Sequence, residues 1–284
     1  VSEARQKCAN HIFKLGGNVY AFDSTTIDLC LSVFWWAKFR KKKGGIKVHT
    51  LYDVETQIPA FFHITEASVH DSKVMIEIPY EPSSYYIFDR GYNNFKILYK
   101  IHQIEAYFVV RAKKNLGYKS IQWKRRLPKN VLSDASVFLT GFYPKQYYPE
   151  PLRLVKYWDE EQEREFTFIT NAMHISALQV AELYKNRWQV ELFFKWLKQH
   201  LKIKRFWGTT ENAVRIQIYA AICAYCLVAI IQHDMQLNRS TYEVLQILSI
   251  SLTDKTHLRD LFDKTKFQND KERFGPNGPS LFNF

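Results

Sequence analysis

The segment from Tyr184 to Lys198 constrains this chain more than any other part of the sequence. It reads YKNRWQVELFFKWLK, and Tyr184, Arg187, Glu191 and Lys198 follow one another at spacings of three, four and seven residues. At about 100° of rotation per residue in an α-helix, these four positions fall within an arc of roughly 60°. The pattern predicts a helix with one carboxylate among cations and a ring, which suits a metal ion held beside a phosphate backbone. The simpler alternative is an amphipathic surface helix with ordinary Glu/Lys pairs.

The charge of the chain favours a polyanionic partner. Its 284 residues contain 40 Lys and Arg against 28 Asp and Glu, which gives a formal net charge of +12. An excess of this kind suits nucleic acid or an acidic membrane surface. The first sixteen residues contain no apolar signal core. The most apolar segment, Ile216 to Ile231, includes Gln217 and is short for a bilayer span, so we expect a buried core helix and no membrane.

Four cysteines are scattered along the chain, which fits a reducing compartment such as the cytoplasm. Cys223 and Cys226 form a C-x-x-C inside the apolar run. No second pair of ligands lies near them, so we expect small core residues and no zinc or redox site.

Two further acids follow short apolar runs. Asn18 to Asp23 reads NVYAFD and Tyr85 to Asp89 reads YYIFD, so each acid is expected at the end of a buried strand. Strand ends in α/β sheets are common places for polar site residues, although either Asp alone could cap a turn. Together with Glu191 they would form three converging carboxylates, which repel one another unless cations neutralise them. Two Mg²⁺ ions would do so and would leave positions open for water and phosphate oxygens.

The remaining pattern predicts an α/β fold. Short alternating segments punctuated by Gly, Pro and Asp occupy about 113–171 and indicate an all-β insertion. Ser176 is the expected N-cap of one long helix to about His200, with Gln179 as a variant of the capping box. A second, apolar helix is expected over 212–232.

Three motifs in order resemble a known family. FDST at Asp23, FDRGY at Asp89 and Y-x2-R-x3-E-x6-K from Tyr184 are similar to the motifs of DDE transposases from bacterial insertion sequences, in the IS-four-like group with the YREK signature. The resemblance covers roughly Asn18 to Gln232. Only 22 residues precede Asp23, where family members usually carry a helical DNA-binding domain. We therefore expect this chain to lack that N-terminal domain.

The resemblance implies a ribonuclease H-like catalytic core with the all-β insertion between the second and third catalytic acids. Residues 1–112 would form the first part of the core, 113–172 the insertion, 173–235 the second part with the YREK helix, and 236–284 a C-terminal tail.

The resemblance also implies an activity. Asp23, Asp89 and Glu191 would be the catalytic acids and the ligands of two Mg²⁺ ions, with Mn²⁺ as another suitable ion. The reactions would be phosphodiester hydrolysis and transesterification at insertion-sequence ends. The partners would be double-stranded DNA, namely terminal repeats and target, and a second copy of the chain in a synaptic complex. The implied location is the bacterial cytoplasm, at the nucleoid.

Several residues are candidates for contacts with DNA. The resemblance implies phosphate contacts for Arg187 and Lys198, and a phosphate or stacking contact for Tyr184. Trp188 could stack on an unpaired base or belong to the core. The other candidates, each of which could equally lie on an ordinary surface or cap a turn, are Arg90 and Thr25 (or Ser24) beside the acids and Lys41, Lys42 and Lys43 in a basic run.

His70 and Asp71 form an HD pair between the first two acids. Such a pair could bind a metal or transfer a proton, but an N-cap role for Asp71 at the start of a short helix is the simpler account.

Two other functions are compatible with parts of this pattern. A truncated transposase could persist as a catalytically inactive DNA-binding remnant. A glycoside hydrolase could use two of the acids, but the net charge and the cations beside Glu191 argue against it.

Overall fold

The computed structural model describes residues 13, 15–40, 43–200, 206–237, 239, 241–251 and 255–264. The chain divides into two compact units, residues 1–226 and 227–284.

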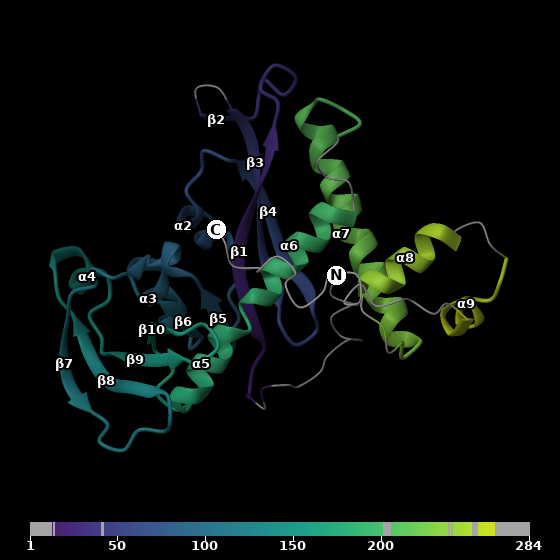
Figure 1. The fold of residues 1–284 in the computed structure, drawn as a ribbon. Coiled ribbons are helices and arrows are strands. Elements are labelled where there is room, and N and C mark those ends of the chain that lie inside the picture. Colours follow the sequence, from purple (N-terminus) through teal and green to yellow (C-terminus); the bar gives the residue numbers. More distant parts are fainter. Residues whose placement is uncertain are drawn as a thin grey trace. The chain divides into compact units, whose positions relative to one another are not determined.

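The first unit is built on a mixed sheet in which, over the described residues, ten strands take part (Figure 1). Their order is β2-β3-β1-β5-β6-β10-β9-β8-β7, and β4 pairs with β3. The strands are β1 (Val19–Leu29), β2 (Lys38–Arg40), β3 (Lys43–Asp53), β4 (Ile58–Glu66), β5 (Tyr85–Phe88), β6 (Tyr107–Arg111), β7 (Tyr118–Trp123), β8 (Val131–Leu139), β9 (Leu152–Asp159) and β10 (Arg164–Thr170). The predicted α/β class is confirmed.

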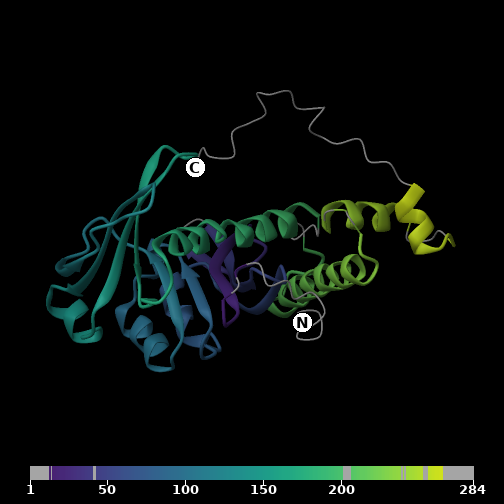
Figure 2. The same cartoon turned by 90° about the horizontal axis from the view of Figure 1, so that it is seen from below.

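The strand pairing in the centre of the sheet changes from antiparallel to parallel at β1. This strand is antiparallel to β3 along its length but parallel to β5 only from Val19 to Phe22, where Phe22 lies opposite Phe88. β5 is also parallel to β6, whereas β6, β10, β9, β8 and β7 follow one another in antiparallel pairs. The strands of the β-rich segment therefore extend the same sheet (Figure 2). The expectation of strands alone over this segment is wrong, because α4 (Phe142–Tyr147) lies between β8 and β9.

The helices of the first unit pack against this sheet. α5 contacts β5, β6, β8 and β9, and α6 contacts β1. α3 contacts β6 and α4, and α4 contacts β8. Besides α4, the helices are α2 (Asp71–Val74), α3 (Phe95–Gln103), α5 (Ala177–Lys185) and α6 (Trp188–His200), with single 3₁₀ turns η1 (Met75–Glu77) and η2 (Arg90–Tyr92). The longer α7 (Glu211–Asp234) begins in the first unit and ends in the second.

The helix expected from Ser176 to His200 is two helices. Ser176 caps α5 with a complete capping box, since its hydroxyl accepts from the Gln179 N–H and the Gln179 side chain accepts from the Ser176 N–H. α5 ends at Lys185, and α6 begins at Trp188. Between them the N–H of Arg187 donates to the Tyr184 carbonyl three residues back, so a tighter turn replaces the continuous α-helix.

α7 is buried on one side only. Val214, Ile218 and Ile222 are buried, whereas Ile216 and Tyr219 are exposed, so the expected core helix is covered on one face. Among the described helices, α7 is the one whose 24 residues and mean hydropathy of 2.0 meet the length and composition of a membrane span, which alone is weak evidence.

The C-x-x-C expectation is correct for only one of its two cysteines. Cys226 is buried, and Cys223 is exposed.

The second unit contains α8 (Thr241–Ser251) and α9 (Leu258–Lys264). Its small core is formed by the side chains of Val228, Val244, Ile247 and Phe262. The guanidinium of Arg239 donates to the carbonyl of Phe262 at 2.6 Å and ties the segment before α8 to α9.

Candidate active site

The first two acids lie where the parallel pairing of β1 and β5 ends. Asp89 directly follows β5, as expected, and precedes η2. Asp23 is not at a strand end: β1 continues to Leu29 through its pairing with β3. Because the last β1–β5 pair is Phe22 with Phe88, both acids come one residue after the same rung. From Asp23 onward, β1 therefore no longer pairs with β5.

Tyr184 connects the end of α5 to the second acid. Its ring is buried against Phe166 and Phe168 of β10, with centroids 5.9 and 4.7 Å away. Its hydroxyl donates to Asp89 Oδ1 at 2.9 Å. Burial, together with the Asp89 carboxylate, raises the pKa of Tyr184 to about 12, so the hydroxyl keeps its proton. The prediction that the Tyr184 ring stacks on DNA is therefore wrong, because the ring is buried against Phe166 and Phe168.

Arg187 connects the first and third acids. Its Nη1 contacts Asp23 Oδ2 at 2.6 Å and its Nη2 contacts Glu191 Oε1 at 2.5 Å. Burial alone would lower the pKa of this guanidinium, but Asp23, Tyr184 and Glu191 raise it above its usual range. A cation and a hydroxyl from the YREK segment thus contact the three predicted acids, Arg187 the first and third and Tyr184 the second.

The electrostatics of the first acid differ from those of an exposed carboxyl. Burial raises the pKa of Asp23 to about 6, although the Arg187 guanidinium and the Ser24 N–H both lower it. The neighbouring carboxylates of Glu191 and Asp89 raise it further. Asp23 therefore ionises at a higher pH than an exposed carboxyl does.

A pocket of about 470 Å³ lies beside these acids. It brings Thr25 and Lys198, both predicted site residues, next to Asp23 and Glu191. Its complete lining is Asp23, Ser24, Thr25, Glu191, Phe194, Lys195, Lys198 and Gln199.

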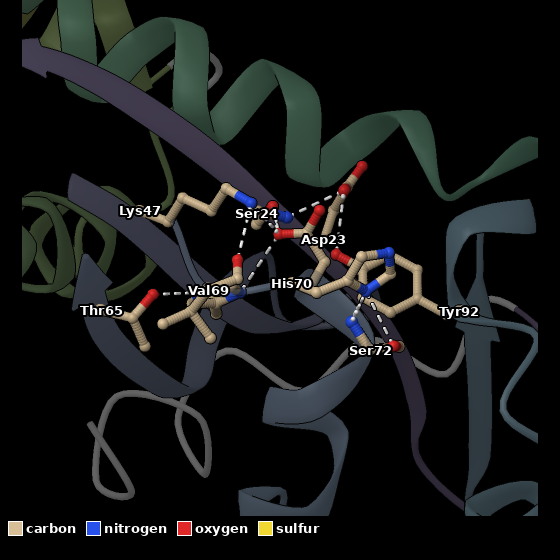
Figure 3. A network of polar contacts seen from close by, with 10 residues as sticks. Asp23, Ser24, Lys47, Thr65, Val69, His70, Ser72 and Tyr92 are labelled. Carbon is tan, nitrogen blue, oxygen red and sulfur yellow. Dashed lines mark hydrogen bonds and ion pairs between the residues drawn. The ribbon is translucent and has the colours of Figure 1, made fainter. Parts of the chain in front are cut away.

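The HD pair is arranged differently from the expectation. His70, rather than Asp71, is the N-cap of α2, because its ring accepts from the Ser72 N–H. The Asp71 carboxylate is thereby available to other partners: Ser24 Oγ donates to its Oδ1 at 2.8 Å, and Lys47 Nζ lies 3.1 Å from the same oxygen (Figure 3).

Sequence reasoning missed Lys47 and Tyr92. Lys47 lies in β3 opposite Thr26, and its amine also donates to the Val69 carbonyl. The Tyr92 hydroxyl donates to Asp23 Oδ1 over 3.5 Å (Figure 3), and burial holds its pKa well above the usual range. Tyr92 belongs to the FDRGY motif, so the motif contained its signal, whereas nothing in the sequence marks Lys47.

The other candidates lie around this centre. Trp188 begins α6 and is about half exposed, 48%, so the core interpretation is wrong and its ring is accessible. Arg90 lies in η2 next to Asp89 and is half-buried. Lys41 and Lys42 lie outside the described residues, and Lys43 is described only as the first backbone position of β3.

The carboxylate oxygens are the donor type that Mg²⁺ and Mn²⁺ prefer. Over the described part of the chain, however, no three His, Cys, Asp or Glu side chains are grouped closely enough to hold a metal ion. Instead Arg187 supplies the positive charge between Asp23 and Glu191. The donor chemistry therefore fits a divalent cation, provided that the guanidinium gives up these two contacts.

A family model for the transposase DDE domain matches residues 14–227. The chain belongs to this transposase family. The family membership expected from the three motifs is confirmed, and a DDE transposase acts on DNA as an enzyme.

Three relatives agree with this. A protein of Sinorhizobium fredii named as transposase y4zB is 37% identical over 246 residues, which cover 84% of this chain and 67% of the relative. A transposase of insertion sequence element IS5377 from Geobacillus stearothermophilus is 31% identical over 72% of this chain and 54% of its own length. A transposase of insertion sequence element IS4SA from Synechocystis is 25% identical over 84% of this chain and 67% of its own length. The chain thus spans between about half and two thirds of the length of these relatives. Their names as transposases do not favour the alternative of a catalytically inactive remnant.

Proposed function

We propose that this chain cleaves DNA strands at the ends of an insertion sequence and transfers them to a target, with Asp23, Asp89 and Glu191 as the catalytic acids. The observation that carries the proposal is the pair of contacts from Arg187 to the first and third acids, together with the contact from Tyr184 to the second. Asp23 and Glu191, which come from distant parts of the sequence, also line one pocket together with Lys195 and Lys198. The remnant alternative predicts DNA binding without metal-dependent cleavage.

The strand order supports a ribonuclease H-like core. Over β4-β3-β1-β5-β6, the first two pairs are antiparallel and the last two are parallel. We assign 1–112 and 173–235 to this core, 113–172 to an insertion between the second and third acids, and 236–284 to a C-terminal tail. The continuous pairing of β10 with β6 means that the insertion would begin and end at the same edge of the core sheet.

The three acids would hold two Mg²⁺ ions, or Mn²⁺. Bound there, such ions would supply Lewis-acid activation of a water or 3′-hydroxyl and stabilisation of the leaving oxygen for in-line attack on phosphorus. The chain supplies the oxygen ligands and the shape of the pocket. Ionisation of Asp23 is required, and the positive charge of the ions would favour it by opposing the burial that raises its pKa.

Arg187 has a second task in this proposal. Its planar guanidinium now pairs with two carboxylates, and the same fork matches two phosphate oxygens. When cations neutralise the acids, Arg187 becomes free to bind the phosphate of the reacting strand. Lys198, which lines the pocket, would contact a neighbouring phosphate as a point charge.

The surrounding residues would hold the DNA. Trp188 is exposed at the start of α6 and offers its ring to an unpaired base. Phosphate contacts are proposed for Arg90 and for Lys41, Lys42 and Lys43. The substrate is double-stranded DNA, as terminal repeats and target, bound by two copies of the chain in a synaptic complex at the bacterial nucleoid.

The deciding experiment is nicking of a labelled duplex that carries the element's end sequence, with and without Mg²⁺. We expect metal-dependent nicking that Asp89→Asn and Glu191→Gln each reduce by more than about a hundredfold, because each loses a metal ligand worth several kcal/mol in the transition state. DNA affinity should stay nearly constant in Glu191→Gln. Equal nicking by the unchanged chain and the two variants would overturn the assignment of the acids, and salt-sensitive binding without any nicking would favour the remnant.

A further inference from the structure

Ser24 connects Asp23, the first acid, to a polar network of Asp71 and Lys47 that the proposed chemistry does not use. Its N–H donates to Asp23 Oδ1 at 2.8 Å, and its hydroxyl donates to Asp71 Oδ1 at 2.8 Å. Ser24 also lines the pocket together with Asp23 and Glu191. One residue thus contacts the first acid and the carboxylate of Asp71, and it also lines the pocket where substrate would enter.

Asp71 is held firmly by groups from another strand. Lys47 Nζ lies 3.1 Å from its Oδ1 and donates at 2.9 Å to the Val69 carbonyl (Figure 3). The His49 ring, fully buried in β3, has its Nδ1 3.9 Å from the same oxygen. Because His70 already caps α2, the Asp71 carboxylate is not needed as a helix cap. Its charge is directed at the Ser24 hydroxyl and the Lys47 amine.

The direction of the Ser24 hydroxyl bond has a chemical consequence. A serine hydroxyl has one proton to donate and two lone pairs that accept. Donation to Asp71 commits the proton, so the oxygen of Ser24 can act in the pocket only as an acceptor. A hydroxyl that donates to an anion is polarised and accepts more strongly.

We propose that Ser24 accepts a hydrogen bond from the water or 3′-hydroxyl that attacks phosphorus, and that Asp71 and Lys47 are positioning residues that fix its hydroxyl for this purpose. The inference rests on the proposed function and adds a contact to it. Ser24 orients the nucleophile beside Asp23, and no proton is transferred to Ser24, because its own proton stays on the bond to Asp71.

The test is a double-mutant cycle on single-turnover nicking with Mg²⁺ and the end-sequence duplex. We expect Ser24→Ala to lower the rate constant about tenfold, the size of one lost hydrogen bond to a reacting group, with little change in the duplex concentration that gives half the maximal rate. Asp71→Ala should act similarly. In the Ser24→Ala background Asp71→Ala should have almost no further effect, since both act through one hydroxyl.

Three further variants separate this role from a structural one. Ser24→Thr keeps a hydroxyl and should retain most of the rate, and Asp71→Asn keeps an acceptor oxygen and should fall between the parent and Asp71→Ala. Ser68→Ala is the matched control, because its hydroxyl also donates to a carboxylate, Glu66 Oε2 at 3.3 Å, but does not line the pocket. It should nick like the parent. Thermal unfolding of every variant checks that the fold is kept.

Several outcomes overturn the inference. Parent-like rates in Ser24→Ala, or rate losses from Ser24→Ala and Asp71→Ala that simply multiply, would mean that the hydroxyl does not orient the nucleophile. A loss that follows the thermal midpoint, with Ser24→Thr as slow as Ser24→Ala, would make the network structural only. Absence of nicking by the unchanged chain would overturn the proposed function and this inference together, whereas nicking by Ser24→Ala at the rate of the unchanged chain would overturn this inference alone.

Discussion

Arg187 determines the charge balance of the site at the scale of single residues. It pairs with one carboxylate that is mostly buried, Asp23, and one that is largely exposed, Glu191. Without the guanidinium these two acids would repel each other, and burial would raise the pKa of Asp23 further. A divalent cation bound to these acids would therefore compete with Arg187 for the same pair of carboxylates.

We expect Arg187→Ala to be less stable than the parent by at least about 1 kcal/mol at pH 7.5, since it leaves a buried carboxylate without its partner. Mg²⁺ should raise its melting temperature more than that of the parent, because no guanidinium has to be displaced. Thermal unfolding with EDTA and with millimolar Mg²⁺ measures both effects. In the same variant DNA binding should weaken and depend less on salt. Equal Mg²⁺ shifts in variant and parent would contradict the competition.

His49 makes the stability of the fold depend on pH. Burial lowers its pKa from 6.5 to about 4; nearby Lys47 and His63 lower it as well, while Asp71 opposes them. Above pH 6.5 the ring is neutral in both folded and unfolded chains. Between pH 6.5 and 4 His49 is protonated in the unfolded chain but stays neutral in the folded chain. The free energy of unfolding therefore decreases as the pH falls through this range.

The expected loss from His49 is roughly 3 kcal/mol between pH 7 and 4. Asp23 acts in the opposite direction, because a carboxyl whose pKa is raised to about 6 stabilises the fold as the pH falls through that value. The variant His49→Gln isolates the first effect. We expect its unfolding free energy, measured in urea at pH 7.5 and 4.5, to fall less than that of the parent. An identical fall in both proteins would rule out His49 as the source.

The sequence indicated part of this residue-scale arrangement. Asp23, Asp89 and Glu191 stood out because each combined an acid with a recognisable local pattern. The partners of Asp71 could not be predicted in the same way, because Ser24 and Lys47 reach it from two strands through register and side-chain length. Trp188 was ambiguous because its helical position depends on where α6 begins.

At the scale of elements, the division of the expected helix into α5 and α6 is the main difference from the sequence pattern. No Gly or Pro lies between Ser176 and His200, and helical spacing runs through the whole segment. The tighter turn at Asn186 and Arg187 coincides with the residue whose guanidinium spans the first and third acids. Tertiary pairing of this kind overrides local propensity and leaves no sequence signal.

Arg153 anchors the start of α5 to the β-rich segment. Only 2% of this residue is exposed. Its guanidinium binds both oxygens of Asp134 at 2.8 Å and donates to the carbonyls of Ala172 and Ile175, just before the Ser176 cap. A buried ion pair of this kind tolerates joint replacement far better than the loss of one partner.

We expect Arg153→Met to cost about 3–5 kcal/mol of unfolding free energy, because it removes the two buried contacts to Asp134, which keeps only the half-exposed Lys124 as a cationic partner, and leaves two carbonyls without the Arg153 donor. The double variant Arg153→Met with Asp134→Leu removes the buried charge as well and should recover at least half of that loss. Urea unfolding of the parent and both variants makes the comparison. A double variant as unstable as the single one would show that the carbonyl contacts, rather than the ion pair, dominate the anchor.

At the scale of the whole molecule, the positive charge is unevenly distributed. Residues 113–147 contain eight Lys or Arg, all exposed, and a single acid, Asp134, which is buried. The same stretch exposes aromatic rings, among them Trp123, Phe142 and Tyr143. A surface with this composition suits a phosphate backbone and gives affinity that depends strongly on salt.

We expect the triple variant Lys119→Gln, Arg125→Gln and Arg126→Gln to bind a DNA duplex more weakly and to reduce the slope of log affinity against log salt by about 2 to 3, since each phosphate that is no longer neutralised lowers the slope by close to 0.9. Fluorescence anisotropy over a range of NaCl concentrations measures the slope. Lys73→Gln, Lys96→Gln and Lys100→Gln remove the same charge from exposed positions on α2 and α3 and serve as the control. If both triple variants flatten the slope equally, the net charge of the chain governs binding; if only the first does, residues 113–147 contact the duplex directly.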